Sequence, residues 1–415
     1  MRLMTGSPGS SNSQGMRPCC STCQRRRRRA AMPTPSGAPP TSDSSLVGRE
    51  HVFGIGLPPE RVTSTVPSTM PELVDLLHDA VPFALPLSRS FRGLQMREGL
   101  LIRGPSGWGE FAPFEDYTSQ QAAPWLAGAA EAAFGTWPQP QRVEVPVNAI
   151  IPAVHADDAA AIARSAVLDH GCATVKVKVA APGERLADDE ARVASVRDAI
   201  DVAMRGVGRE GRGKIRLDAN AGWTLDEAAR ALARLVAYDI DYVEQPCGEL
   251  EDLQRLREQV EVRIAVDESV RIGGVAMGEL ESIADVVIIK VGPIGGVRAG
   301  LRLVQDWPGE VVVSGALDSA VGLAAGVALA TALPRAPGAC GLGTGALLAE
   351  DVVSPPLVPV DGMLDVRRVS PDLDALMRAR GRLDDDQARH WRERAVEVWH
   401  SGGAELVKQA IAGGV

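Results

Sequence analysis

The segment Thr174-Val-Lys-Val-Lys-Val179 shapes the interpretation of the whole chain. Its valines and lysines alternate, and a period of two predicts a β-strand with two different faces. The valines then cover one face, while Lys176 and Lys178 share the other. A buried strand face that carries two lysines is costly unless it lines a polar site. The segment therefore predicts a core strand that ends at a functional cavity.

Similar β-branched runs recur after this point and before it. Helical, Ala/Leu/Arg-rich stretches such as 225–238 and 250–259 separate most of them. Strands that alternate with helices in this way predict a parallel (β/α) barrel, and a doubly wound open sheet is the competing α/β architecture. The runs cover residues 145–151, 173–179, 214–219, 241–244, 263–267, 286–291, 311–314 and 339–342.

Carboxylates stand at the C-terminal ends of three consecutive runs, in Asp218-Ala-Asn220, Glu244-Gln-Pro and Asp267-Glu268-Ser. In a parallel barrel these ends meet at one mouth, where barrel active sites form. Three carboxylates in one site need a cation, and a ligand set made only of oxygens suits Mg²⁺ better than zinc. We therefore expect an Mg²⁺ site in which Mn²⁺ can substitute.

Lysines flank the carboxylates on both sides, because Lys178 ends an earlier run and Lys290 a later one. A nearby metal ion and neighbouring lysines favour the neutral amine, since like charge disfavours the ammonium. A neutral lysine can act as a general base. Together with Mg²⁺, it predicts removal of a proton α to a carboxylate, and hence a small-molecule carboxylate substrate.

Composition limits the remaining possibilities. Hydrophobic residues make up 45% of the 415 residues, which excludes global disorder. The formal net charge is −9, and residues 1–49 carry eight arginines and one aspartate, which leaves −16 on residues 50–415. An acidic body argues against nucleic acid as a partner, and no apolar run is long enough to span a membrane. The wide spacing of Cys172, Cys247 and Cys340 predicts reduced thiols and a cytoplasmic protein.

Several motifs resemble the enolase superfamily, in its muconate-lactonizing-enzyme-like subgroup, and within it the o-succinylbenzoate synthase family of menaquinone biosynthesis. The resemblance extends from Met70 to the C-terminus. The motifs are Lys176-Val-Lys178, Asp218-Ala-Asn220-Ala-Gly-Trp223, Val243-Glu-Gln-Pro-Cys247, Asp267-Glu-Ser269, Ile289-Lys-Val-Gly-Pro-Ile-Gly-Gly296, Ser314-Gly-Ala-Leu-Asp-Ser-Ala-Val-Gly322 and Cys340-Gly-Leu-Gly-Thr344.

The resemblance implies a modified TIM barrel, (β/α)7β, with an α+β capping domain. Residues 70–144 would form the N-terminal part of the cap, 145–360 the barrel with the active site, and 361–415 a segment that returns to the cap. Residues 1–69 are of low complexity and are expected to be disordered. We expect the physiological start at Met70, which would make the upstream start codon a mis-assigned one.

The resemblance also implies a role for each polar residue. Lys178 would take the α-proton of 2-succinyl-6-hydroxy-2,4-cyclohexadiene-1-carboxylate and then help the hydroxyl leave as water. Lys290 would face the opposite side of the ring and stabilise the enediolate, and Lys176 would contact the substrate carboxylate. The expected Mg²⁺ ligands are Asp218, Glu244 and Asp267.

Other residues are expected to support this site. Asn220 and Glu268 are expected to orient the metal ligands and not to bind the ion themselves. Ser314, Gly341 and Leu342 are candidates for the substrate pocket, where strand-end turns would present backbone N–H groups to a carboxylate.

Two kinds of alternative stay open at the level of the sequence. The same lysines and carboxylates would serve an N-succinylamino acid racemase, a dipeptide epimerase or a muconate-type cycloisomerase. The segments 314–322 and 340–344 favour the synthase. A non-enzymatic alternative is a binding protein that acts through Arg25–Arg29, with an inactive barrel as its scaffold.

Overall fold

A parallel sheet of seven strands forms the centre of the computed structural model, which describes residues 70–91, 93–271 and 275–412. The predicted tail at 1–69 lies outside these residues. Each strand pairs with its neighbours in sequence, whereas a doubly wound sheet would reverse its strand order. The barrel prediction is therefore confirmed. The strands are β5 (Ala149–Ile151), β6 (Thr174–Lys178), β7 (Lys214–Asp218), β8 (Ile240–Glu244), β9 (Ile264–Val266), β10 (Val286–Ile289) and β11 (Glu310–Val313).

The ring closes through the last predicted run, 339–342, which forms single bridges instead of a full strand. Cys340 makes a parallel bridge to Val147, next to β5, and Gly341 makes one to Ser314, next to β11. The two edges of the seven-stranded sheet thus meet across this run.

The first predicted run, 145–151, is divided in the structure. Its beginning belongs to β4 (Glu144–Pro146), which pairs antiparallel with β12 (Met363–Asp365) in a separate two-stranded sheet. Only its end is the barrel strand β5. Pro146 has no backbone N–H to donate, which suits a strand end. The expected barrel boundary at residue 145 therefore falls inside β4.

Helices follow most barrel strands and cover their outer face. In the amphipathic helix α5, Thr224 caps the N-terminus by accepting the N–H of Glu227, and one helical face packs on the core through Ala228, Ala231, Leu232 and Leu235. The helices of the barrel are α3 (Ala156–Leu168), α4 (Leu186–Gly206), α5 (Leu225–Leu235), η1 (Val236–Tyr238), α6 (Leu250–Arg257), α7 (Glu268–Arg271), α8 (Met277–Leu280), α9 (Val291–Ile294), α10 (Val297–Leu303), α11 (Ala320–Ala332) and η2 (Gly343–Leu347).

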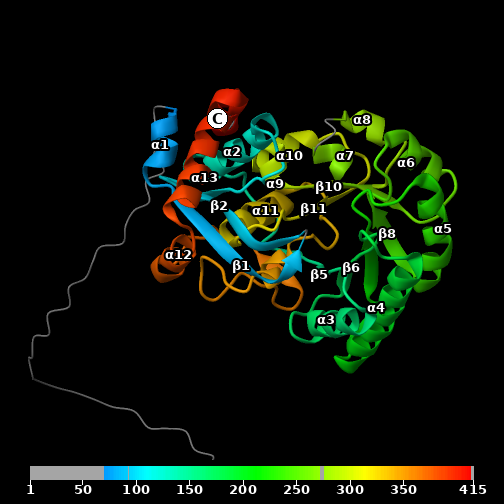
Figure 1. The fold of residues 1–415 in the computed structure, drawn as a ribbon. Coiled ribbons are helices and arrows are strands. Elements are labelled where there is room, and N and C mark those ends of the chain that lie inside the picture. Colours follow the sequence, from blue (N-terminus) through cyan, green and yellow to red (C-terminus); the bar gives the residue numbers. More distant parts are fainter. Residues whose placement is uncertain (1–69, 92, 272–274, 413–415) are drawn as a thin grey trace, which may run out of the picture. The chain divides into compact units, whose positions relative to one another are not determined.

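The cap combines the two ends of the described chain. Trp391 and Trp399, near the C-terminus, share a buried cluster with Leu126 and Trp125 of helix α2. Figure 1 accordingly shows the red helix α13 beside the cyan elements β2 and α2. The cap elements are α1 (Leu73–His78), β1 (Val81–Phe91), β2 (Leu94–Gly104), β3 (Gly107–Phe111), α2 (Ser119–Phe134), α12 (Leu373–Arg380), α13 (Asp385–Val398), η3 (Trp399–Gly403) and α14 (Ala404–Ala412).

The interior of the barrel changes from apolar to charged along the strands. A small cluster contains Tyr242, Ala265, Ile288 and Val312 together with Val286. A polar residue follows two positions after four of these apolar residues, on the same face of the strand. Glu244 follows Tyr242, Asp267 follows Ala265, Lys290 follows Ile288 and Ser314 follows Val312. Strand alternation therefore places these polar groups together at the carboxyl ends. Within the described ranges, no helix combines the length and the apolarity that a bilayer span requires.

Candidate active site

A pocket opens at the carboxyl ends of the barrel strands, and both parts of the fold line it. The cap contributes three aromatic side chains, Phe114, Tyr117 and Trp125. The barrel contributes Ile150, Lys176, Lys178, Asp218, Arg271, Lys290, Pro293, Ser314, Gly315, Ala316, Leu317 and Thr344. Five residues predicted from the sequence thus share one cavity with an aromatic wall.

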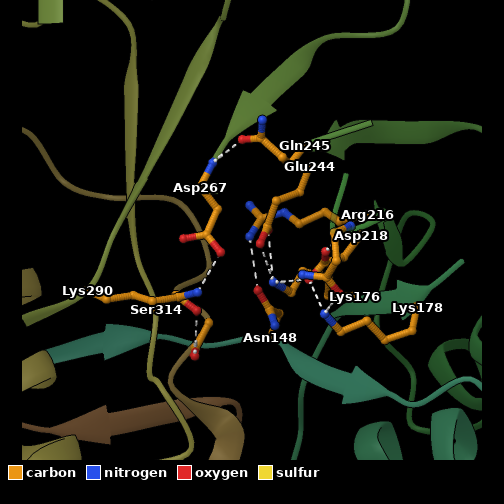
Figure 2. A network of polar contacts seen from close by, with 12 residues as sticks. Asn148, Lys176, Lys178, Arg216, Asp218, Glu244, Gln245, Asp267, Lys290 and Ser314 are labelled. Carbon is orange, nitrogen blue, oxygen red and sulfur yellow. Dashed lines mark hydrogen bonds and ion pairs between the residues drawn. The ribbon is translucent and has the colours of Figure 1, made fainter. Parts of the chain in front are cut away.

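The lysines of β6 lie on one face of the strand and contact the carboxylates of the next two strands (Figure 2). The Nζ of Lys176 lies 2.8 Å from Asp218 Oδ2 and 2.8 Å from Glu244 Oε1. The Nζ of Lys178 lies 2.6 Å from the same Asp218 oxygen. Asp218 therefore forms ion pairs with both lysines.

Asn220 links this group to the next strand end. Its Oδ1 accepts from Lys178 Nζ, and its Nδ2 donates to Glu268 Oε1 at 3.3 Å. Its backbone N–H donates to Asp218 Oδ1 at 3.2 Å. The residue adopts a left-handed conformation, with φ at 46°, which turns the chain sharply after the strand. Asn220 thus hydrogen-bonds to Lys178, Asp218 and Glu268.

Lys290 lies on the opposite side of the carboxylates from Lys178, as Figure 2 shows. Its Nζ donates to Asp267 Oδ2 at 2.6 Å. The other oxygen of Asp267 accepts from Arg271 Nε at 3.3 Å. Lys178 and Lys290 therefore lie on opposite sides of the pocket, and each of them pairs with a different aspartate.

The two lysines of β6 differ in charge preference. Burial lowers the pKa of Lys178, and the charge of Lys176 adds to this effect against the attraction of Asp218. Burial also disfavours the ammonium of Lys176, but Asp218 and Glu244 outweigh it and raise the pKa of that group. Lys178 is therefore the lysine whose neutral form is more accessible, as a general base requires.

The three predicted metal ligands are buried side by side, each about 1% exposed. Burial and the neighbouring Asp218 raise the pKa of Glu244 to about 7. Burial alone would raise the pKa of Asp267, but Lys290 and Arg271 hold it at about 2. Glu244 is thus the carboxylate whose charge is least compensated.

The donor chemistry of this set fits a hard divalent cation, because every donor is a carboxylate oxygen. As the side chains stand, no three acidic, imidazole or thiol groups in the described ranges are close enough together to hold a metal ion. The ammonium groups of Lys176 and Lys290 lie against these carboxylates instead. A bound cation would therefore have to replace these lysine contacts.

Gln245 is a site residue that the sequence reasoning missed. Its Oε1 accepts the backbone N–H of Asp267 at 3.0 Å, and its Nε2 donates to Ser269 Oγ at 2.9 Å. It follows Glu244 directly and has a positive φ of 41°. The side chain thus ties the end of β8 to the end of β9, and its place inside Glu244-Gln-Pro was the only signal for it.

Arg271 and Tyr117 were also missed. The Nη1 of Arg271 donates to the hydroxyl of Tyr117, so the barrel and the cap are joined at the rim of the pocket. Arg271 lies four residues after Asp267, one helical turn on, which was a weak signal. Tyr117 carried none, because nothing in the local sequence shows which barrel strand a cap residue faces.

The expected pocket residues at the closing seam have different surroundings. Ser314 lines the pocket, and its Oγ donates to Gly341 O at 3.3 Å. Gly341 and Leu342 are not among the lining residues, and the side chain of Leu342 packs toward Gly326 of α11. Their contact with substrate stays a prediction. Thr344 does line the pocket, although the sequence analysis did not select it.

Comparison with known families agrees with this architecture. The family described as "Enolase C-terminal domain-like" matches residues 158–371, and "Enolase N-terminal domain-like" matches residues 82–133. Among solved structures, a muconate lactonizing enzyme from Pseudomonas fluorescens has a TM-score of 0.62 at 20% identity, over 72% of this chain and 97% of that one. The L-Ala-D/L-Glu epimerase from Bacillus subtilis has a TM-score of 0.59 at 21% identity, over 71% and 96%. These two likenesses concern the fold.

Sequence relatives are more specific. An o-succinylbenzoate synthase from Thermobifida fusca is 49% identical over 288 residues, which are 69% of this chain and 87% of that protein. The o-succinylbenzoate synthase from Mycobacterium marinum is 44% identical over 327 residues, 78% of this chain and 93% of that one. Enzymes of the enolase superfamily use Mg²⁺ as a general rule. The chain belongs to the o-succinylbenzoate synthase family of the enolase superfamily.

Proposed function

We propose that the chain dehydrates 2-succinyl-6-hydroxy-2,4-cyclohexadiene-1-carboxylate to 2-succinylbenzoate in menaquinone biosynthesis. One observation carries this proposal: Lys178 and Lys290 lie on opposite sides of a row of buried carboxylates and line the same pocket. Family membership narrows the many reactions of such a site to this one.

Lys178 is the base in this proposal. Its amine takes the proton α to the ring carboxylate, and the electrons of the broken C–H bond move into the carboxylate as an enediolate. The resulting ammonium then returns the proton to the hydroxyl, which leaves as water. The ring becomes aromatic, which favours the products, and Lys178 is neutral again. The lowered pKa of Lys178 supports the first step.

The other two lysines act as charges. Lys290 faces the opposite side of the substrate and stabilises the enediolate. Its 2.6 Å contact with Asp267 is one that a cation at Asp267 would replace. Lys176 is the lysine whose pKa is raised, so in this proposal it is charged, contacts the substrate carboxylate and lowers the pKa of Lys178. Such fixed charges stabilise the transition state most strongly where water is excluded.

Asp218, Glu244 and Asp267 would hold Mg²⁺, and Mn²⁺ can substitute for it. When bound, the ion neutralises the negative charge that develops on the substrate carboxylate. Asn220 supports this set through its N–H bond to Asp218, and its amide also holds Glu268. We propose an orienting role for both residues.

The aromatic wall gives the pocket its shape. Phe114 and Tyr117 each meet the Trp125 ring close to edge-on, with interplanar angles of 82° and 79°. This wall presents apolar surface to a cyclic substrate and excludes water. Ser314 lines the same pocket, and we propose that it contacts a substrate carboxylate together with Gly341 and Leu342.

The direct test compares two reactions with the purified full-length chain and Mg²⁺. We expect fast dehydration of the cyclohexadiene carboxylate and slow racemisation of an N-succinylamino acid. A specific observation favours the racemase as the second candidate, because lysines on opposite sides of one pocket also suit a two-base mechanism. A reversed ratio of the two rates would establish the racemase, and neither reaction would refute both.

The cellular setting forms part of the same proposal. Cys172, Cys247 and Cys340 are all buried and unpaired, as expected for a protein of the reducing cytoplasm. The acidic body gives no reason to expect nucleic acid as a partner. Removal of residues 1–69 should leave the dehydration rate unchanged, whereas a protein that binds through Arg25–Arg29 would lose its function.

A further inference from the structure

Glu131 is a buried carboxylate in the cap that the proposed reaction does not use. It lies in α2, is 1% exposed, and has mostly alanine neighbours on its own helix. Its Oε2 accepts the backbone N–H of Val297, and its Oε1 accepts that of Arg298 at 3.0 Å. These two residues begin α10 of the barrel, so a cap side chain holds a barrel segment.

Glycines on both segments allow their backbones to approach closely at this contact. Gly296 precedes α10 with a φ of +117°, and a Cβ at this residue would lie 2.3 Å from Glu131 Oε2. On the cap side, a Cβ at Gly128 would lie 3.2 Å from the backbone nitrogen of Gly296. A Cβ at Gly296 would displace the Glu131 carboxylate, and one at Gly128 would press on the backbone of the barrel segment. The approach is therefore specific to these residues.

The same face of α2 holds the rest of the segment. The Trp125 ring lies so close to Gly292 that a Cβ there would be 2.5 Å from it, and Pro124 packs beside Gly295. Positions 124, 125, 128 and 131 follow the helical period and form one face. This face covers the segment 291–298, which begins directly after Lys290.

We propose that Glu131 is a positioning residue for Lys290, and that it fixes from the cap the backbone segment 291–298 that directly follows this lysine. The proposal rests on the proposed function, in which the Lys290 ammonium must face the substrate. Glu131 holds this segment at Val297, seven residues after Lys290, which lines the pocket. Because Trp125 and Pro293 both line the pocket, this contact also sets the spacing between the aromatic wall and Lys290.

The electrostatics of Glu131 fit a role beyond packing. Burial raises its pKa to about 7, although the N–H groups of Arg298 and Val297 lower it. A buried carboxylate costs free energy that an apolar residue of similar size would avoid. Its two oxygens, however, satisfy two adjacent N–H donors at once, which an apolar residue would leave unpaired.

Glu131→Gln in the full-length chain tests the proposal, because the amide keeps the size but offers one acceptor oxygen for two donors. We expect kcat for dehydration to fall about 10- to 100-fold, as for other small misplacements of a reacting group, while KM changes less than about threefold. Backbone amides of residues 291–298 should exchange hydrogen about tenfold faster, as expected for one lost hydrogen bond.

Thr331→Val is the matched control. Thr331 is fully buried in α11, and its hydroxyl donates to Val327 O at 2.9 Å, within its own helix. This variant removes a buried hydrogen bond without a change at the segment 291–298. It should lower the melting temperature while kcat and the exchange rates of that segment stay unchanged.

Gly296→Ala perturbs the same contact from the barrel side and serves if Glu131→Gln does not fold. It should reproduce the loss of kcat. An unchanged kcat with faster exchange would show that the contact is merely structural, and unchanged exchange would show that Glu131 does not hold the segment.

Failure of the proposed function would look different. The wild-type chain would then lack dehydratase activity, while hydrogen exchange would still report the contact. If the chain racemises instead, the same loss of kcat is expected there, because Lys290 faces the substrate in both reactions.

Discussion

Two ionic layers occupy the same barrel, one at the active-site end of the strands and one nearer their amino ends. Strand β7 contributes to both, with Asp218 in the upper layer and Arg216 two residues earlier in the lower one. The upper layer comprises Lys176, Lys178, Asp218, Glu244, Asp267 and Lys290. The lower layer comprises Asn148, Arg216, Asp241, Arg263 and Glu310.

The lower layer is held by guanidinium groups with directed bonds. Arg216 is 1% exposed, and it donates to Asp241 at 2.9 Å and to Asn148 at 3.1 Å. Its guanidinium also lies 4.6 Å from the centre of the Tyr242 ring. Arg263 donates to Glu310 at 2.8 Å. None of these residues lines the substrate pocket.

The difference between the layers is one of cation type. A guanidinium keeps its charge and fixes several acceptors in one plane, whereas an ammonium is a mobile point charge with a pKa that its surroundings can shift. The arginine layer therefore suits structure, and the lysine layer suits proton transfer and exchange of partners. The two layers should accordingly fail in different ways when they are mutated.

Lys178→Ala should have the largest effect on activity. It removes the base and leaves Asp218 paired with Lys176, so the rate should fall on the order of 10²- to 10⁴-fold while the fold is retained. Steady-state kinetics and thermal unfolding of the same preparation would check this. Retained turnover would show that another residue is the base. A large loss of stability would show that the upper layer also stabilises the fold.

Asp218→Asn should have the next largest effect. The amide keeps the shape but removes a charged oxygen donor, so half-saturation should need at least about tenfold more Mg²⁺ and kcat should fall too. Activity measured against Mg²⁺ concentration would show both changes. An unchanged metal requirement would remove Asp218 from the ligand set.

Arg216→Met should spare catalysis and reduce stability. It removes the Arg216 bond from Asp241, which keeps only Arg263 as a guanidinium donor, and the bond from Asn148; breaking a buried ion pair costs about 3 kcal/mol or more. Urea unfolding would measure this, with Arg263→Met as a control. Arg263 is 38% exposed, so its loss should cost less than about 1 kcal/mol. A large fall in kcat for Arg216→Met would mean that the layers are coupled.

The smallest expected effect concerns acid stability. Burial opposes ionisation of Asp241, but Arg216 and the other cations lower its pKa in the folded protein. As the pH falls below about 4, the unfolded chain therefore binds this proton first, and the stabilisation present at higher pH is lost. Asp241→Asn should flatten this part of the stability–pH curve, which unfolding at several pH values would reveal. An unchanged slope would assign the acid sensitivity to other carboxylates.

The upper layer was largely predictable from the sequence, because alternation in Val175-Lys-Val-Lys-Val179 and charges at strand ends need only local periodicity. The lower layer was not predicted. Arg216 alternates with Ile215 and Leu217 just as the lysines of β6 alternate with valines, but its partners, Asp241 of β8 and Asn148 just before β5, come from other parts of the ring. The sequence does not show which strands meet around a closed ring.

The boundaries of the strands were also only partly predictable from the sequence. The run 145–151 reads as one strand, yet its first part pairs with Met363–Asp365, far along the chain. The positions of the aromatic wall and of Glu131 were likewise not predictable, because they depend on how the cap packs on the barrel. The face that helix α2 turns toward Lys290 follows from tertiary packing, which local pattern does not show.

The seam at Cys340 and Gly341 has a consequence for synthesis of the protein. The chain leaves the ribosome from its N-terminus, so Val147 emerges long before the residue that it must meet. The cap is completed later still, by helices that end at Ala412. The lysines and carboxylates of the pocket are thus translated before the residues that enclose them. Until the run 339–342 has been made, the strands already present have an open sheet edge, which another chain could pair with.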